Sequence, residues 1–119
     1  ALRSKTFILI TLLFLSFSIK SHADFKPLEK EVLTLKEKLS TIKSIQKDEL
    51  EASLDSIKEK AALIVNDIAR TDLTGDVDIL LKKYVYKNED SFVESKELDY
   101  WLDHIVDDLA MFIKMGITE

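Results

Sequence analysis

The chain has 119 residues, no cysteine, two glycines and one proline, and its formal net charge is −5 at pH 7. The missing cysteines exclude disulfide bonds, thiol chemistry and thiolate zinc sites, and so few glycines and prolines disfavour a turn-rich β architecture. An acidic chain is also poorly suited to nucleic acid or anionic lipid, whose binding depends on Lys and Arg. We therefore expect one small, mostly helical domain.

The N-terminus has the features of a secretion signal peptide. Arg3 and Lys5 precede an apolar run over residues 7–19, which has the length of a signal-peptide core and is too short to span a bilayer. Ser21 and Ala23 supply small residues at the positions that a signal peptidase reads, so we predict cleavage after Ala23. An N-terminal anchor that stays uncleaved is the alternative.

The expected organisation is a signal peptide over residues 1–23 and a single helical domain over residues 24–119. Removing 23 residues leaves 96, and the net charge becomes −8, because the removed segment carries three basic residues and no acidic one. Such a leader predicts an exported protein, periplasmic or secreted, with no stable membrane span after cleavage. Without disulfides, its stability must come from core packing or from association.

Residues 27–70 carry apolar side chains three or four positions apart, the spacing of a helix that buries one face. These residues are Leu28, Val32, Leu35, Leu39, Ile42, Leu50, Leu54, Ile57, Ala61, Ile64 and Ile68. The rhythm slips between Leu39 and Leu50, which leaves two interpretations open: one long helix, or a helical hairpin that turns near residues 46–48. A long helix would need a partner chain to cover its apolar seam, whereas a hairpin would not.

The rest of the chain predicts two further helices. Residues 71–76 contain Gly75 and several cap-type residues, so we expect a loop there, followed by a helix over residues 76–87. A last helix is predicted over residues 92–115, and Gly116 is a typical helix stop. Their core positions are Val77, Leu80, Leu81, Tyr84 and Val85, then Leu98, Leu102, Ile105, Leu109 and Phe112. The predicted fold class is all-α: an antiparallel bundle of three to four helices after a cleaved N-terminal signal peptide.

No catalytic motif is present. A phosphate loop, a G-x-S-x-G elbow, an H-E-x-x-H pair and an EF-hand calcium loop all need glycines or histidines that this chain lacks. His104 is the one histidine beyond the predicted leader, and no Glu-x-x-His motif occurs, which disfavours haem and di-iron bundles. We therefore predict no catalytic residue, no metal site and no cofactor, and a role other than that of an enzyme.

The last predicted helix carries most of the polar candidates. His104 and Asp108 lie four residues apart, and we interpret them as a polar pair at the border of the core; a proton acceptor or half of a metal site is the alternative. Asp99, Asp103 and Asp107 recur every fourth residue and predict a row of negative charge opposite the core stripe. Such a row is either a solvated face or a docking strip for a basic partner.

Two aromatic residues flank the predicted core stripes and could anchor an interface if they are exposed. The candidate partner-binding residues are thus Asp99, Asp103, Asp107, Tyr86, Trp101 and His104. The primary hypothesis is an exported, small, acidic helical protein that binds another protein with a basic surface, for example as an inhibitor or immunity-type protein in the cell envelope. The alternatives are a self-associating coiled-coil component, which would form a homodimer, and a bundle that carries an apolar ligand.

Overall fold

The computed structural model describes residues 25–117, so the predicted signal peptide and its cleavage after Ala23 lie outside the described residues. The elements are α2 (Phe25–Thr41), β1 (Ser44–Gln46), α3 (Lys47–Ala61), α4 (Asp67–Leu80), the π-helical turn η2 (Leu81–Tyr86), β2 (Phe92–Glu94) and α5 (Ser95–Lys114). The expectation of a mostly helical chain is confirmed. A small two-stranded antiparallel sheet, which the sequence did not predict, accompanies the helices.

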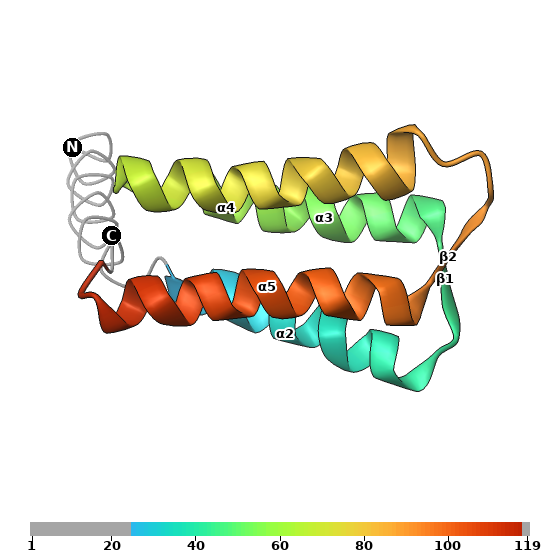
Figure 1. Cartoon of the computed structure of the whole chain (residues 1–119), viewed down its shortest axis with the longest axis horizontal. Coiled ribbons are helices and arrows are strands. Elements are labelled where there is room, and N and C mark those ends of the chain that lie inside the picture. The colour runs from blue at the N-terminus through green and yellow to red at the C-terminus, as the bar shows by residue number, and fades with distance from the viewer. Residues whose placement is uncertain (1–24, 118–119) are drawn as a thin grey trace, which may run out of the picture.

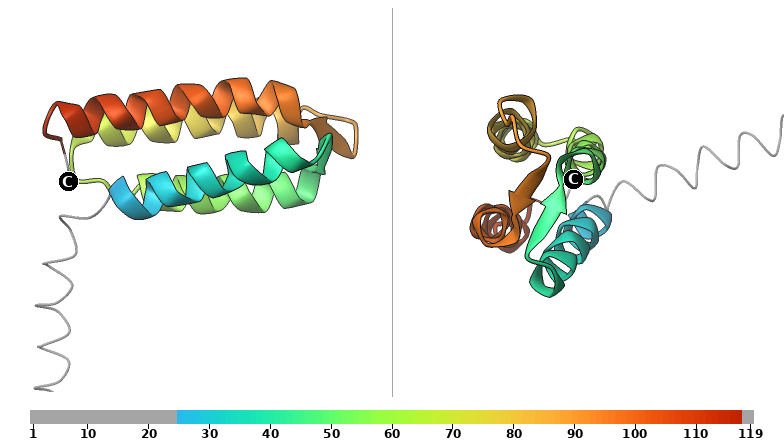
Figure 2. Two further views of the ribbon diagram at one scale, coloured as in Figure 1. Left: turned by 90° about the horizontal axis from the view of Figure 1, so that it is seen from below. Right: turned by 90° about the vertical axis from the view of Figure 1, so that its right-hand side faces the viewer.

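The helices form two helix–loop–helix hairpins that lie against each other as a bundle (Figure 1). One hairpin is α2 with α3, and the other is α4 and η2 with α5. Between the hairpins, α2 packs against α5 and α3 packs against α4. In the end-on view of Figure 2 the helices surround a common centre, and β1 and β2 cross one end of the bundle.

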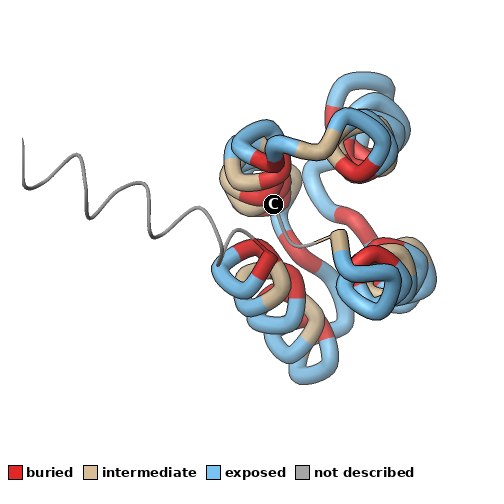
Figure 3. The backbone as a smooth tube through the Cα atoms, turned by 90° about the vertical axis from the view of Figure 1, so that its left-hand side faces the viewer, coloured by how far each residue is buried: buried red, intermediate tan, exposed pale blue. Residues whose placement is uncertain are grey.

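The core lies along the axis of the bundle, where every helix turns its buried residues inward (Figure 3). Its fully buried members include Leu28, Leu50, Leu54, Ile57, Leu73, Leu80, Leu98, Leu102 and Ile105. All core positions predicted for the last two helices are buried, as are most of those predicted between residues 27 and 70. Ile68 is a wrong prediction, because its side chain is 71% exposed.

The chain turns between α2 and α3, so the structure contains the hairpin rather than the long helix. The turn holds β1, which pairs antiparallel with β2 in the register Ser44 with Glu94, Ile45 with Val93 and Gln46 with Phe92. Ile45 and Val93 point inward and are buried, while their neighbours on each strand are exposed. The alternation lets two short strands close the end of the core. The expectation that residues 92–94 begin the last helix is therefore wrong.

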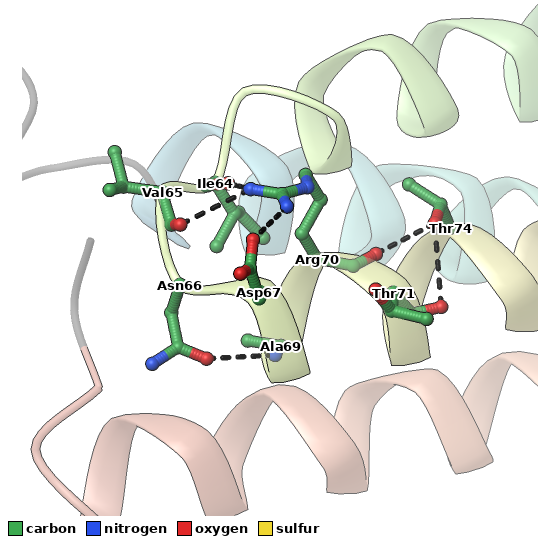
Figure 4. A network of polar contacts seen from close by, with 8 residues as sticks. All are labelled: Ile64, Val65, Asn66, Asp67, Ala69, Arg70, Thr71 and Thr74. Carbon is green, nitrogen blue, oxygen red and sulfur yellow. Dashed lines mark hydrogen bonds and ion pairs between the residues drawn. The ribbon is translucent and has the colours of Figure 1, made fainter.

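The predicted loop over residues 71–76 is also wrong, because those residues lie inside α4. The helix starts nine residues earlier than predicted, where the side chain of Asn66 accepts a 3.0 Å hydrogen bond from the amide of Ala69 (Figure 4). Asparagine is a strong N-cap, because its side chain satisfies one of the amides left free in the first turn. Arg70 fixes the preceding turn by donating to the carbonyls of Ile64 and Val65, at 3.0 and 3.1 Å.

This earlier start explains why Ile68 is exposed. A helix that begins at Asp67 turns Ala69 and Leu73 toward the core, and Ile68 then lies about 100° away, on the solvent side. Inside the helix, the hydroxyl of Thr74 donates to the carbonyl of Arg70 at 2.7 Å, so this cap-type residue satisfies itself within the α-helix.

The sequence predicts a helix that ends at residue 87. In the structure α4 ends at Leu80, and the π-helical turn η2 follows it. The amide of Lys87 donates to the carbonyl of Lys82, five residues back, at 3.0 Å. Leu81, Tyr84 and Val85 are all buried in this turn, as the sequence predicts for their core positions.

The last helix stops as predicted. Gly116 has φ of +83°, and the amide of Ile117 donates to the carbonyl of Phe112 at 2.9 Å, the closing bond of a glycine-terminated helix. Across residues 25–117, none of the helices is sufficiently long and apolar to cross a bilayer.

Candidate functional site

Ionisable side chains meet on the border between α4 and α5, beside the core. On α4, Asp72 and Asp76 each precede a buried core residue and are one helical turn apart. On α5, His104 and Asp108 are also one turn apart and face α4. The Nε2 atom of His104 lies 3.4 Å from an Asp108 carboxylate oxygen and 4.0 Å from one of Asp76. We call Asp72, Asp76, His104 and Asp108 the α4–α5 cluster.

The electrostatics of this cluster are unfavourable for negative charge. Burial, a hydrogen bond with Asp108 and the charges of Asp72 and Asp108 together raise the pKa of Asp76 to about 7, while His104 acts in the opposite direction. Burial and the proximity of Asp108 also raise the pKa of Asp72. Carboxylates that lie this close cannot all ionise cheaply. Asp72 and Asp76 are therefore harder to ionise than ordinary aspartates.

Asp76 carries an unusual oxygen. Its Oδ2 atom is buried and has no hydrogen-bond partner, and 4.0 Å to His104 is too long for a hydrogen bond. Buried polar atoms are rarely left unpaired, because a missing hydrogen bond costs about 1–3 kcal/mol. The sequence predicted the His104–Asp108 pair on one helix, and the structure adds Asp76 and Asp72 from another element.

The predicted acidic row is divided by the structure. Lys36 on α2 forms ion pairs with Asp99, at 3.0 Å, and with Asp103, so these two carboxylates contact α2. Partial burial opposes the charge of Lys36, but its hydrogen bonds with Asp103 and Asp99 prevail and raise its pKa. Asp107 is exposed and forms no ion pair with another described residue. The three aspartates therefore do not make one uniform strip.

Because Asp103 pairs with Lys36 and Asp107 does not, removing the charge of Asp103 should affect stability more than removing the charge of Asp107. Asp103→Asn removes an acceptor of Lys36 and should lower the free energy of unfolding by up to about 1 kcal/mol at low ionic strength, and by less at high ionic strength. Asp107→Asn, the matched control, should change it by less than about 0.5 kcal/mol. Urea denaturation at the two ionic strengths measures both. Equal effects of the two variants would show that the Lys36 contacts do not stabilise the fold.

The two candidate aromatic residues differ in exposure. Tyr86 is 63% exposed, whereas Trp101 is half-buried and packs against the core. The ammonium of Lys83 lies 5.4 Å from the Trp101 ring centroid, a cation–π distance, and Tyr100 meets the same ring edge-on at 5.7 Å. Trp101 is thus occupied by contacts within the chain. Tyr100, which the sequence interpretation passed over, is the more exposed aromatic at 72%.

One exposed apolar surface is at the opposite end of the bundle from the strands. Leu63, Val65 and Ile68 are 72%, 64% and 71% exposed around the α3–α4 connection, and Met115 is 64% exposed near the C-terminal end of α5. The connection and this end of α5 lie at the same end of the bundle (Figures 1 and 2). We call these four residues the apolar end. All four side chains of the apolar end are at least 64% exposed.

The two helix–loop–helix units share their local order of elements with EF-hands, which bind calcium in the loop between two helices. That twelve-residue loop supplies oxygen ligands at positions 1, 3, 5, 9 and 12, with glutamate last. If Glu49 is taken as position 12 of the first loop, Lys38 is at position 1 and Ile42 at position 5. Neither side chain can bind calcium. Instead, the ammonium of Lys38 forms an ion pair with Glu49 and bridges the two ends of the loop.

The second loop is also incomplete. Counted back from Glu97, it begins at Tyr86, and Ser91 stands where the sharp turn of a calcium loop requires glycine. The side-chain amide of Asn88 donates to the carbonyl of Tyr84 at 3.0 Å, so this residue stabilises the end of η2. Neither described loop presents the calcium ligand set.

Sequence reasoning missed the site residues that a second helix, α4, brings next to α5. No spacing on α5 alone indicates Asp76, and the exposure of Ile68 was missed because this residue continues the predicted core stripe. Leu63 and Val65 lie off the predicted stripe of Ala61, Ile64 and Ile68, and this position was the available signal for their exposure. Searches against protein families, curated proteins and solved structures return no match for this chain.

Proposed function

We propose that this chain is an exported, acidic, non-enzymatic protein that acts by binding another protein through its apolar end. More specifically, the chain would act in the cell envelope as an inhibitor of its protein partner or as an immunity-type protein. Cleavage after Ala23 and a periplasmic location belong to it as well, and they rest on the leader-like N-terminus. A mature net charge of −8 favours a partner with a basic surface, because opposite charges speed encounter and orient the complex.

The observation that carries the proposal is the exposure of the apolar end. Leu63, Val65 and Ile68 are each at least 64% exposed within six residues of sequence. The turn that bears them is held in place by the Asn66 cap and the hydrogen bonds of Arg70, so these side chains are presented on an ordered backbone (Figure 4). A backbone that is already ordered loses little conformational entropy on binding, which favours an interface.

The two alternatives from the sequence have less support. A coiled-coil assembly needed an apolar seam open along residues 27–70, and that seam packs inside the bundle instead. A carrier needs a place for an apolar ligand. A surface groove of about 670 Å³ lies near the strands, and its lining mixes the apolar Leu39 and Ile42 with Lys43, Glu94 and Asp99.

Site-specific photo-crosslinking in the envelope of the source cell tests the proposal. A photoreactive amino acid at position 63 or 68 should give the same discrete adduct, and the same probe at Leu33, which is 45% exposed on α2, should not. Val65→Ser should abolish the adduct while changing the free energy of unfolding by less than about 0.5 kcal/mol, because the side chain is exposed. The predicted cleavage after Ala23 is tested separately: the mass of the chain recovered from the envelope should correspond to a start at Asp24.

The identity of the adduct decides between the interpretations. A heterologous protein with a basic surface supports the proposal. An adduct with twice the mass of the chain would overturn it in favour of self-association, and labelling no stronger at positions 63 and 68 than at position 33 would overturn it outright.

A further inference from the structure

We propose that Asp76, His104 and Asp108 form a binding site for one divalent transition-metal ion, of the class represented by Zn²⁺. The site lies on the border of α4 and α5 and does not depend on the apolar end or on a protein partner. It combines one imidazole nitrogen with carboxylate oxygens from two helices. It revises the expectation from the sequence that the chain has no metal site.

The geometry fits a small ion. One donor atom from each of the three residues lies within 4.8 Å of the other two. Zinc bonds of about 2.0–2.2 Å at tetrahedral angles place neighbouring donor atoms roughly 3.3–3.6 Å apart. The His104–Asp108 distance of 3.4 Å already meets this requirement, and the His104–Asp76 distance of 4.0 Å must shorten by about half an ångström. Because the His104 side chain is 55% exposed, its ring can move without disturbing the core.

The orphaned oxygen of Asp76 is a second and independent indication. Oδ2 is buried, contacts no hydrogen-bond donor, and belongs to a side chain that is only 16% exposed. Buried charged groups in proteins are either paired or coordinate metal ions. Oδ2 is one of the converging donor atoms, so an ion bound there would supply the missing partner.

The donor set selects the class of ion. Calcium takes six to eight oxygen ligands and magnesium prefers an octahedral oxygen shell, whereas imidazole with carboxylate suits zinc and its neighbours. Three protein ligands leave a fourth position to water, as in other three-ligand zinc sites. Asp72 lies beside Asp108 and adds to the negative charge near the site without being needed as a ligand.

Metal titration of the full-length chain tests the site. After removal of bound metal with a chelator, isothermal titration with Zn²⁺ should show one ion per chain, and Co²⁺ should give the visible absorption of a tetrahedral complex. Asp76→Asn and His104→Gln should each weaken Zn²⁺ binding at least about 10-fold, since loss of a residue that only orients a ligand costs about 10–100-fold. Asp107→Asn removes the same charge from an exposed position on α5 and should leave binding unchanged.

Two results would overturn the proposal of a zinc site. Absence of Zn²⁺ binding to the unmodified chain, or equal affinity in Asp76→Asn, His104→Gln and Asp107→Asn, would show that zinc does not use this cluster. Circular dichroism of each variant keeps misfolding apart from loss of a ligand. His104→Gln changes an exposed side chain, so this variant remains informative if Asp76→Asn unfolds.

Discussion

Replacing Ile45 with alanine should lower the free energy of unfolding by about 2–5 kcal/mol, which is the range for truncating a buried isoleucine. Ile45 is only 1% exposed and pairs with Val93 across the two strands, so the truncation leaves a cavity where the strands close the core. A urea unfolding curve followed by circular dichroism measures the change.

Two further variants calibrate the Ile45 measurement. Ile45→Val keeps the β-branched shape and should cost about 0.5–1.5 kcal/mol. Leu33→Ala removes an apolar side chain of similar size from an exposed position on α2 and should cost less than about 0.5 kcal/mol, apart from its small effect on helix propensity. A cost for Ile45→Ala below that of Leu33→Ala would contradict the inference that the strands belong to the cooperative core.

Asp76→Asn should stabilise the metal-free protein above pH 7, by about 1–3 kcal/mol. The pKa of Asp76 is raised to about 7 in the folded chain from the ordinary value of 3.8, first by burial and then by Asp108 and Asp72. A tenfold change in proton affinity corresponds to about 1.4 kcal/mol, and water at the rim of the cluster reduces the full effect. Asparagine keeps the size of the side chain and cannot ionise.

The sign of the pH dependence follows from the same shift. Between about pH 4 and pH 7 the unfolded chain has lost the Asp76 proton while the folded chain retains it, so stability falls as the pH rises through this window. Below the window both states are protonated, and above it the loss is complete. Thermal unfolding of the metal-free chain at several pH values should show this fall, and Asp76→Asn should flatten it.

The control for this second prediction is Asp107→Asn, whose pH profile should follow that of the unmodified chain. A loss of stability at pH 8 in Asp76→Asn would mean that the carboxylate of Asp76 makes a stabilising contact when ionised. That outcome would contradict the electrostatic account of the α4–α5 cluster.

The sequence predicted the helices well where one face is apolar over several turns. The stripe from Leu98 to Phe112 is buried as expected, because burial of an apolar face is a property of one helix and its spacing. The start of α4 was misplaced, because Gly75 and its polar neighbours were given more weight than Asn66, whose side chain caps the helix. Local composition alone could not show which of several cap-type residues is used.

The strands and the candidate site could not be predicted for a different reason. Ile45 and Val93 are 48 positions apart in the chain, and three residues carry too little alternation to indicate a strand without knowledge of the partner. In the same way, the contact of His104 with Asp76 depends on how α4 and α5 are rotated against each other. Contacts between distant segments follow from the packing of the whole bundle, which no single window of sequence contains.

The strand pair also restricts how the hairpins can move. One end of the bundle is tied by the covalent α3–α4 connection and the other by the ladder around Ile45 and Val93, which continues in the bonds from Lys47 to Ser91 and from Ser95 to Lys43. A slip of one residue would turn the inward side chains of a strand to solvent, so axial sliding carries a high barrier. The alignment of Asp76 with His104 is therefore preserved during thermal fluctuation of the helices.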